Sequence, residues 1–115
     1  MKIREISQLL DAKLYTGEEM LDREVHNGFS CDLMSDVLAY AENEAVLLTG
    51  LVNPQVIRTA EMMDIVCLVF VRGKEPTEAM IKLAEERSIV IMSTDKRMFT
   101  SCGILHDAGL KSGDE

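Results

Sequence analysis

Uninterrupted apolar runs dominate the second half of the chain. The runs at residues 65–71 and 89–92 do not alternate apolar with polar side chains, which indicates strands with both faces covered. Another strand is predicted at residues 45–49, and the segments between the strands have helical spacing. From residue 45 onward the order is therefore strand, helix, strand, helix, strand, helix. Right-handed crossovers make such strands parallel and adjacent, with helices on both faces.

The first 44 residues supply the remaining elements. An amphipathic helix is expected at 3–11 and short strands at 13–16 and 23–30, followed by a helix beginning at Ser30 or Asp32. Later helices are expected from Asn53-Pro54 to about residue 63, from Pro76-Thr77, and over residues 96–108. The N-terminal strands can join the sheet in either direction, so the sheet is mostly parallel or mixed. These elements predict an α/β fold, a three-layer α/β/α sandwich, as one domain over residues 1–110 with a polar tail at 111–115.

Charge and cysteine content limit the expected partners and the expected cellular location of the chain. Twenty acidic residues against twelve basic ones give a net charge of −8, which repels nucleic acid and anionic membrane, so neither is an expected partner. No apolar run approaches the roughly 20 residues of a membrane span. The three cysteines, Cys31, Cys67 and Cys102, form no closely spaced pair, which is typical of reduced thiols. A cytoplasmic location is expected.

Polar residues follow the predicted parallel strands where each of them ends. In open α/β sheets the carboxyl ends of the strands are the usual place for a ligand, and helix N-termini there favour an anion. The predicted pocket is lined by Ser30, Asp32, Thr49, Gly50, Asn53, Arg72, Thr94 and Asp95. The alternative is purely structural: Asn53 and Thr94 or Asp95 cap helices, and Gly50 and Gly73 turn the chain.

Signatures of catalysis and of metal binding are absent from the sequence. It contains no phosphate-binding loop, dinucleotide fingerprint or nucleophile elbow. Asp32 and Asp36 share a helical face, but no further ligands accompany them, and His26 and His106 lack ligand-spaced neighbours. We therefore predict no catalytic residue, no metal site and no cofactor.

Three segments of the chain resemble the DRTGG domain family: LDREVHNGFSCDLMSDVLA, LLTGLVNPQVIRTAEMMD and VFVRGKEPTEAMIKLAEERSIVIMSTD. Asp22 and Arg23 match the Asp-Arg-Thr-Gly-Gly motif, whereas Glu24 and Val25 replace its Thr and first Gly, and the next glycine is Gly28. The last segment is also similar to the N-terminal domain of HPr kinase/phosphorylase. The resemblance implies an α/β/α sandwich, usually dimeric. Such a domain stands alone or accompanies CBS-domain pairs in regulated pyrophosphatases and the catalytic part of some phosphotransacetylases.

Two interpretations of the function remain open. The first is a non-catalytic regulatory domain that binds a small anionic metabolite or nucleotide at the carboxyl ends of the strands. The second is a protein–protein interaction or dimerisation module without a small-molecule ligand. Its only binding partner would be a second copy of the chain, in a homodimer, or a partner enzyme. Neither interpretation makes the chain an enzyme, and we predict that it is not one; a third, enzymatic alternative stays open only because a nucleophile and its base can be distant in the chain.

Overall fold

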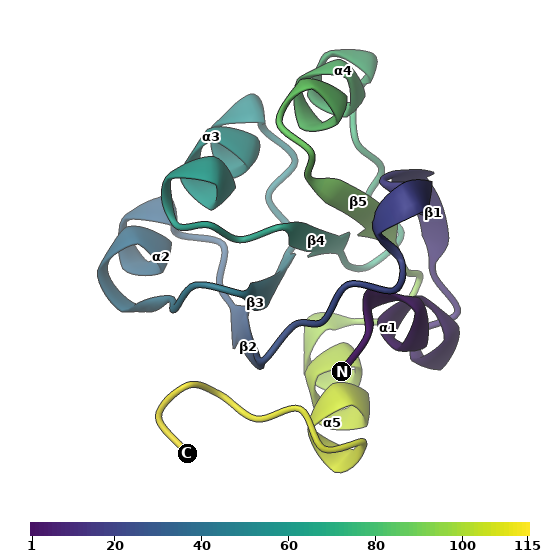
Figure 1. Ribbon diagram of the computed structural model, residues 1–115, viewed down its shortest axis with the longest axis vertical. Helices are drawn as coiled ribbons and strands as arrows, with labels where there is room; N and C mark the ends of the chain where they lie inside the picture. The colour runs from purple at the N-terminus through teal and green to yellow at the C-terminus, as the bar shows by residue number, and fades with distance from the viewer.

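The computed structural model describes residues 1–115 and places a five-stranded sheet between two layers of helices (Figure 1). The strand order is β1-β5-β4-β3-β2; β1 is antiparallel to β5, and the other neighbours are parallel. The fold is therefore a three-layer α/β/α sandwich with a mixed sheet, as the sequence predicts. The strands are β1 (Lys13–Thr16), β2 (Asn27–Ser30), β3 (Ala45–Thr49), β4 (Cys67–Phe70) and β5 (Val90–Ser93).

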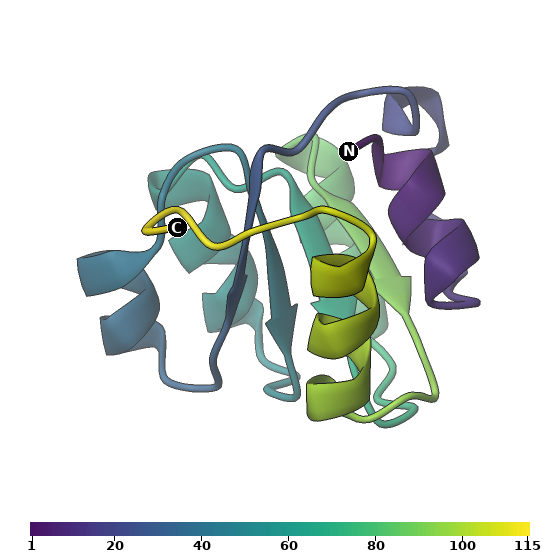
Figure 2. The same ribbon diagram turned by 90° about the horizontal axis from the view of Figure 1, so that it is seen from below.

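Helices cover both faces of the sheet, with α2, α3 and α4 on one face and α1 and α5 on the other (Figures 1 and 2). A short 3-10 helix, η1, follows β1. None of the helices has the length and apolar character that a membrane span requires. Their bounds are α1 (Ile3–Leu9), η1 (Glu18–Met20), α2 (Met34–Tyr40), α3 (Pro54–Met62), α4 (Glu78–Glu86) and α5 (Met98–Asp107).

Each face of the sheet contributes to its own apolar core. Because side chains alternate along a strand, Leu47 of β3 belongs to the core under α2, α3 and α4, while Val46 and Leu48 belong to the core under α1 and α5. In β4, Phe70 and Cys67 divide in the same way. All of these side chains are buried, which explains why their strands read as continuous apolar runs.

Two helix starts agree with their local sequence signals. Asn53 caps α3, because its side-chain oxygen accepts a hydrogen bond from the backbone N–H of Gln55 at 2.8 Å, and Pro54 occupies the first helical position. Thr77 caps α4 by accepting from the N–H of Met80 at 3.2 Å. Both caps satisfy backbone donors that the first turn of a helix leaves free.

Two element boundaries were wrong in the prediction. The helix expected to begin at Ser30 or Asp32 begins at Met34, and Leu33 is its N-cap residue. The strand expected at 23–30 is reduced to β2, because the residues before it pair with the start of the chain: the N–H of Ile3 donates to the carbonyl of Arg23. Asp32 likewise bonds to Thr49 and Gly50. In both places a contact distant in sequence replaces the local one.

The predicted ligand site lies at one edge of the sheet. The four parallel strands end at the same edge, at the bottom of Figure 2. The loops leading from β2, β3, β4 and β5 into α2, α3, α4 and α5 all meet there. At the outer edge of β2 the C-terminal tail passes close by, and the N–H of Gly28 donates to the carbonyl of Lys111 at 3.0 Å.

Candidate ligand site at the carboxyl edge of the sheet

Asp32 connects the end of β2 to the end of β3. One of its carboxylate oxygens, Oδ1, accepts hydrogen bonds from the backbone N–H of Gly50 at 2.7 Å and from the hydroxyl of Thr49 at 3.0 Å. The Thr49 hydroxyl also accepts from the N–H of Leu51 at 3.1 Å. The Asp32 carboxylate thus already occupies two hydrogen-bond donors that would otherwise suit an anion. It also fixes the backbone after β3.

Arg72 stands at the end of β4 in a tight turn. Both Arg72 and Gly73 have positive φ, 59° and 70°, and the N–H of Lys74 donates to the carbonyl of Val71 at 3.2 Å, closing the turn. The N–H of Arg72 donates to the carbonyl of Lys96 at 2.8 Å, and that of Gly73 to the carbonyl of Thr94 at 2.9 Å. The β4–α4 and β5–α5 loops are thereby joined through their backbones.

The guanidinium of Arg72 lies against the backbone of Gly50. A Cβ at position 50 would collide with Nη2 of Arg72 and come within 3.1 Å of its Cζ, while Oδ2 of Asp32 would stand 3.5 Å away. Four other non-glycine residues have positive φ, and each follows a helix; Arg72 is the one that follows a strand. An unfavourable backbone conformation therefore holds this cation at the edge of the sheet. Its guanidinium forms no salt bridge.

Of the eight residues in the predicted pocket, the structure brings Asp32, Thr49, Gly50 and Arg72 together. Asn53 lies nearby, but its side chain caps α3. The other three are placed differently.

Thr94 is buried, and its hydroxyl donates to the carbonyl of Leu10 at 2.7 Å, so it joins two segments of the chain and does not cap a helix. Asp95 lies beyond Gly73 in a separate cleft with Tyr15, whose hydroxyl donates to Glu75 at 3.0 Å. Ser30 lines a cavity on the α5 side of the sheet. The N-cap of α5 is Arg97, not Thr94 or Asp95.

Charge is distributed unevenly between the two edges of the sheet. The loops at the opposite, amino edge (residues 17–26, 41–44, 63–66 and 87–89) carry seven acidic and two basic residues. The loops at the carboxyl edge (residues 10–12, 31–33, 50–53, 71–77 and 94–97) are balanced, with four acidic and four basic residues, and their cations are Arg72, Lys74, Lys96 and Arg97. Sequence reasoning recognised only the first of these cations, because the bonds that join the two loops cannot be inferred from the sequence. The carboxyl edge is where this acidic chain repels an anion least.

Asp22, which matches the family motif, and Glu24, which departs from it, both have structural roles. The guanidinium of Arg4 in α1 donates to the Asp22 carboxylate at 3.1 Å, and this hydrogen bond holds the pKa of that carboxyl below its ordinary value. Glu24, in the place of Thr, pairs with the N-terminal amine at 2.9 Å, which lowers the pKa of Glu24 likewise. These pairs hold the segment before β2 against α1, at the edge opposite to Arg72. No group of three or more His, Cys, Asp or Glu side chains is placed to hold a metal ion.

A comparison with family models shows to which family the chain belongs. Residues 5–108 match the family model described as the DRTGG domain. The chain belongs to the DRTGG domain family. No curated protein matches the sequence of this DRTGG domain.

The fold of this DRTGG domain is similar to a crystal structure of the CBS and DRTGG domains of the regulatory region of Clostridium perfringens pyrophosphatase, complexed with the activator diadenosine tetraphosphate. The two have a TM-score of 0.73 and 14% sequence identity, and the match covers 90% of this chain. It spans 45% of the length of that pyrophosphatase chain. At this identity the likeness concerns the fold.

Proposed function

We propose that this DRTGG domain is a regulatory domain that binds a small anionic ligand, a nucleotide or a phosphorylated metabolite, at the carboxyl edge of its sheet. It acts by binding and not by catalysis, as a cytoplasmic module formed by residues 1–110. The observation that carries the proposal is the guanidinium of Arg72, held against Gly50 by a positive-φ turn and without a carboxylate partner. Support also comes from the family and from a similar domain in a regulatory region that binds a nucleotide activator.

The neighbouring groups define the ligand class. A phosphate suits Arg72, because a guanidinium presents parallel N–H donors that match its oxygens. The carboxylate of Asp32 stands near this cation and repels an anion, but it accepts hydrogen bonds from hydroxyl groups. A ligand with both phosphate and hydroxyl groups satisfies both residues. We therefore favour a nucleotide over inorganic phosphate.

A thermal-shift comparison tests the proposal. The protein is heated with AMP, ATP, diadenosine tetraphosphate, sugar phosphates or inorganic phosphate, and with adenosine as the uncharged control. A ligand at 100 times its Kd stabilises the folded state by about 2.7 kcal/mol, which raises the Tm of a domain of this size by roughly 10 °C. We expect at least one phosphorylated compound to raise the Tm and adenosine to leave it unchanged. Each compound is tested at about 5–10 mM, a concentration of the order needed to saturate a weak site. If none of them changes the Tm, the proposal is wrong.

Helix α2 favours a second function, the formation of a homodimer. Its side chains Leu33 and Tyr40 are 57% and 72% exposed, and Leu38 is 41% exposed, so a seven-residue helix with its N-cap presents three large apolar groups to solvent. Leu33 and Tyr40 are seven positions apart, so they lie on the same side of the helix, and an exposed apolar patch of this kind is typical of a contact surface. We propose that a second copy of the chain covers them.

Light scattering at micromolar concentration tests the dimer, and a mass near 12.8 kDa would contradict it. The variant Tyr40→Lys should shift a dimer toward monomer. Phe99→Lys is the matched control, because Phe99 is 91% exposed but lies at the start of α5 on the other side of the sheet. A dimer that survives Tyr40→Lys unchanged would place the interface elsewhere.

A further inference from the structure

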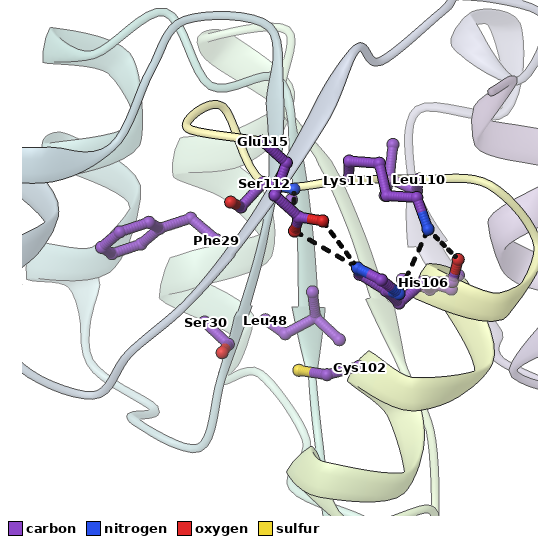
Figure 3. A pocket seen from close by; sticks show the side chains of 11 residues that line it. Phe29, Ser30, Leu48, Cys102, His106, Leu110, Lys111, Ser112 and Glu115 are labelled. Atoms are coloured by element: carbon purple, nitrogen blue, oxygen red, sulfur yellow. Dashed lines mark hydrogen bonds and ion pairs between the residues drawn. The ribbon is translucent and has the colours of Figure 1, made fainter.

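A cavity of about 180 Å³ lies between α5 and the edge strand β2 (Figure 3), and Arg72 is not among the residues that line it. The alternation of side chains along β2 explains it. Phe29 points away from α5 and packs with the core on the opposite face. Gly28 and Ser30 face α5, and one has no side chain while the other has a small one, so the space between strand and helix stays open.

The interior of the cavity is apolar. Leu48 of β3, Leu105 of α5 and Leu110 line it, and all three are almost fully buried in the protein. The free thiol of Cys102 and the exposed hydroxyl of Ser30 face it from opposite sides. A mostly apolar hollow with a few polar groups at its mouth is the usual form of a small-molecule site.

The C-terminal tail forms the rim, and its polar groups are held by hydrogen bonds. The Glu115 carboxylate lies 3.0 Å from Nε2 of His106 and accepts from the N–H of Ser112 at 3.2 Å, while the ammonium of Lys111 donates to the carbonyl of His106 at 3.2 Å (Figure 3). The charged groups of the rim therefore already have hydrogen-bond partners. A charged ligand would have to break these contacts, whereas a neutral one would not.

We propose that this cavity is a second binding site, which takes a neutral molecule with one ring and one hydroxyl group. An enclosed apolar cavity of about 150 Å³ holds a benzene ring, so a volume of about 180 Å³ accommodates one ring. The ring packs between Leu48 and Leu105, and its hydroxyl bonds to Ser30 or Cys102. Phenol is the smallest probe with these properties, and for a ligand of its size we expect a Kd of about 1 mM.

Thiol alkylation in the unmodified protein tests the site, because the cysteines provide their own control. Cys31 has a similar intermediate exposure but lies outside the cavity, and Cys67 is fully buried, with a pKa raised to about 12, and stays unreactive. Iodoacetamide is added with increasing phenol, and each cysteine is followed by peptide mass spectrometry. At phenol concentrations of about ten times Kd, alkylation of Cys102 should slow about ten-fold and that of Cys31 should not change.

Two leucine substitutions provide a second measurement. Ser30→Leu fills the cavity from β2 and should abolish the protection of Cys102 by phenol. Ser35→Leu, a change of equal size on the exposed face of α2, should leave the protection intact. The proposal is overturned if phenol slows Cys102 and Cys31 equally or not at all, or if protection survives Ser30→Leu. None of these outcomes depends on Arg72, so they are distinguishable from a failure of the proposed anion site.

Discussion

The side chain of Arg72 packs on the backbone of Gly50, so that the end of β4 covers the end of β3 at the carboxyl edge of the sheet. The contact exists because position 50 has no Cβ, and it places the guanidinium near Asp32, with which it forms no salt bridge. The candidate ligand site depends on this packing.

Replacing Gly50 with Ala should displace the guanidinium without unfolding the protein. The new Cβ would meet the far end of a flexible side chain, and Gly50 does not have positive φ, so we expect a stability change below about 1 kcal/mol. Affinity for the phosphorylated ligand should fall as Arg72 moves away. Urea unfolding and titration calorimetry measure the two effects. A large loss of stability with unchanged affinity would contradict the role given to this contact.

Replacing Gly17 with Ala should be far more costly. Gly17 has φ +86°, and its Cβ would lie 2.5 Å from Cγ2 and 3.1 Å from Cα of Val90, a buried residue of β5. Overpacking and a left-handed backbone together should cost about 2–4 kcal/mol in urea unfolding. Gly103→Ala in α5 is the control, because nothing lies within 4 Å of its Cβ. That change should stabilise the protein by about 1 kcal/mol.

Much of the fold was predictable because its signals are local. The cap formed by Asn53 and Pro54 involves residues adjacent in sequence, and the buried strands β3, β4 and β5 are apolar on both faces. The sequence did not decide between a mostly parallel and a mixed sheet, since β1 and β2 carry no signal for their direction. The structure places β1 antiparallel at one edge and β2 parallel at the other.

The candidate site was less predictable, because long-range contacts form it. Asp32 was expected in the first turn of α2, but it bonds to Thr49 and Gly50, 17 and 18 residues away. Thr94 was expected at the strand ends or as a cap, but its hydroxyl bonds to the carbonyl of Leu10, 84 residues away. Local patterns contain no information about such partners. The cavity beside Ser30 has no sequence signal apart from the small residues of β2.

Replacing Ser88 with Gly should stabilise the protein. Ser88 follows α4 with φ +56°, and the N–H of Ile89 closes the helix end by donating to the carbonyl of Ala84 at 2.9 Å. Glycine adopts this left-handed conformation without steric cost, so we expect a gain of about 1 kcal/mol in urea unfolding. Glu85→Gly, inside α4, should instead cost about 1 kcal/mol. Equal losses for both variants would show that Ser88 is not left-handed.

The pair between Arg4 and Asp22 should contribute stability only where the carboxylate is ionised. The hydrogen bond from Arg4 lowers the pKa of Asp22 from its ordinary value of 3.8, so the contribution is present above that value and disappears as the pH falls through the lowered pKa. Arg4→Gln should therefore destabilise the protein slightly at pH 7 and not at the lowest pH.

Urea unfolding from neutral to strongly acidic pH measures this difference. Arg23→Gln is the control, because Arg23 is exposed and forms no salt bridge. Its effect should be independent of pH. An effect of Arg4→Gln that grows on acidification would have the wrong sign for this pair.

The anion site is tested most directly by calorimetric titration of Arg72→Ala and Arg87→Ala with the phosphorylated compound that raises the Tm most. Both variants lose one positive charge, but Arg87 follows α4 at the amino edge, where it pairs with Glu61 at 3.2 Å. A hydrogen bond to a charged group is worth about 1.5–3 kcal/mol, so Arg72→Ala should weaken binding roughly 10- to 100-fold. Arg87→Ala should retain the affinity of the parent. Equal affinities for the parent and both variants would contradict the account, since the ligand would then bind elsewhere.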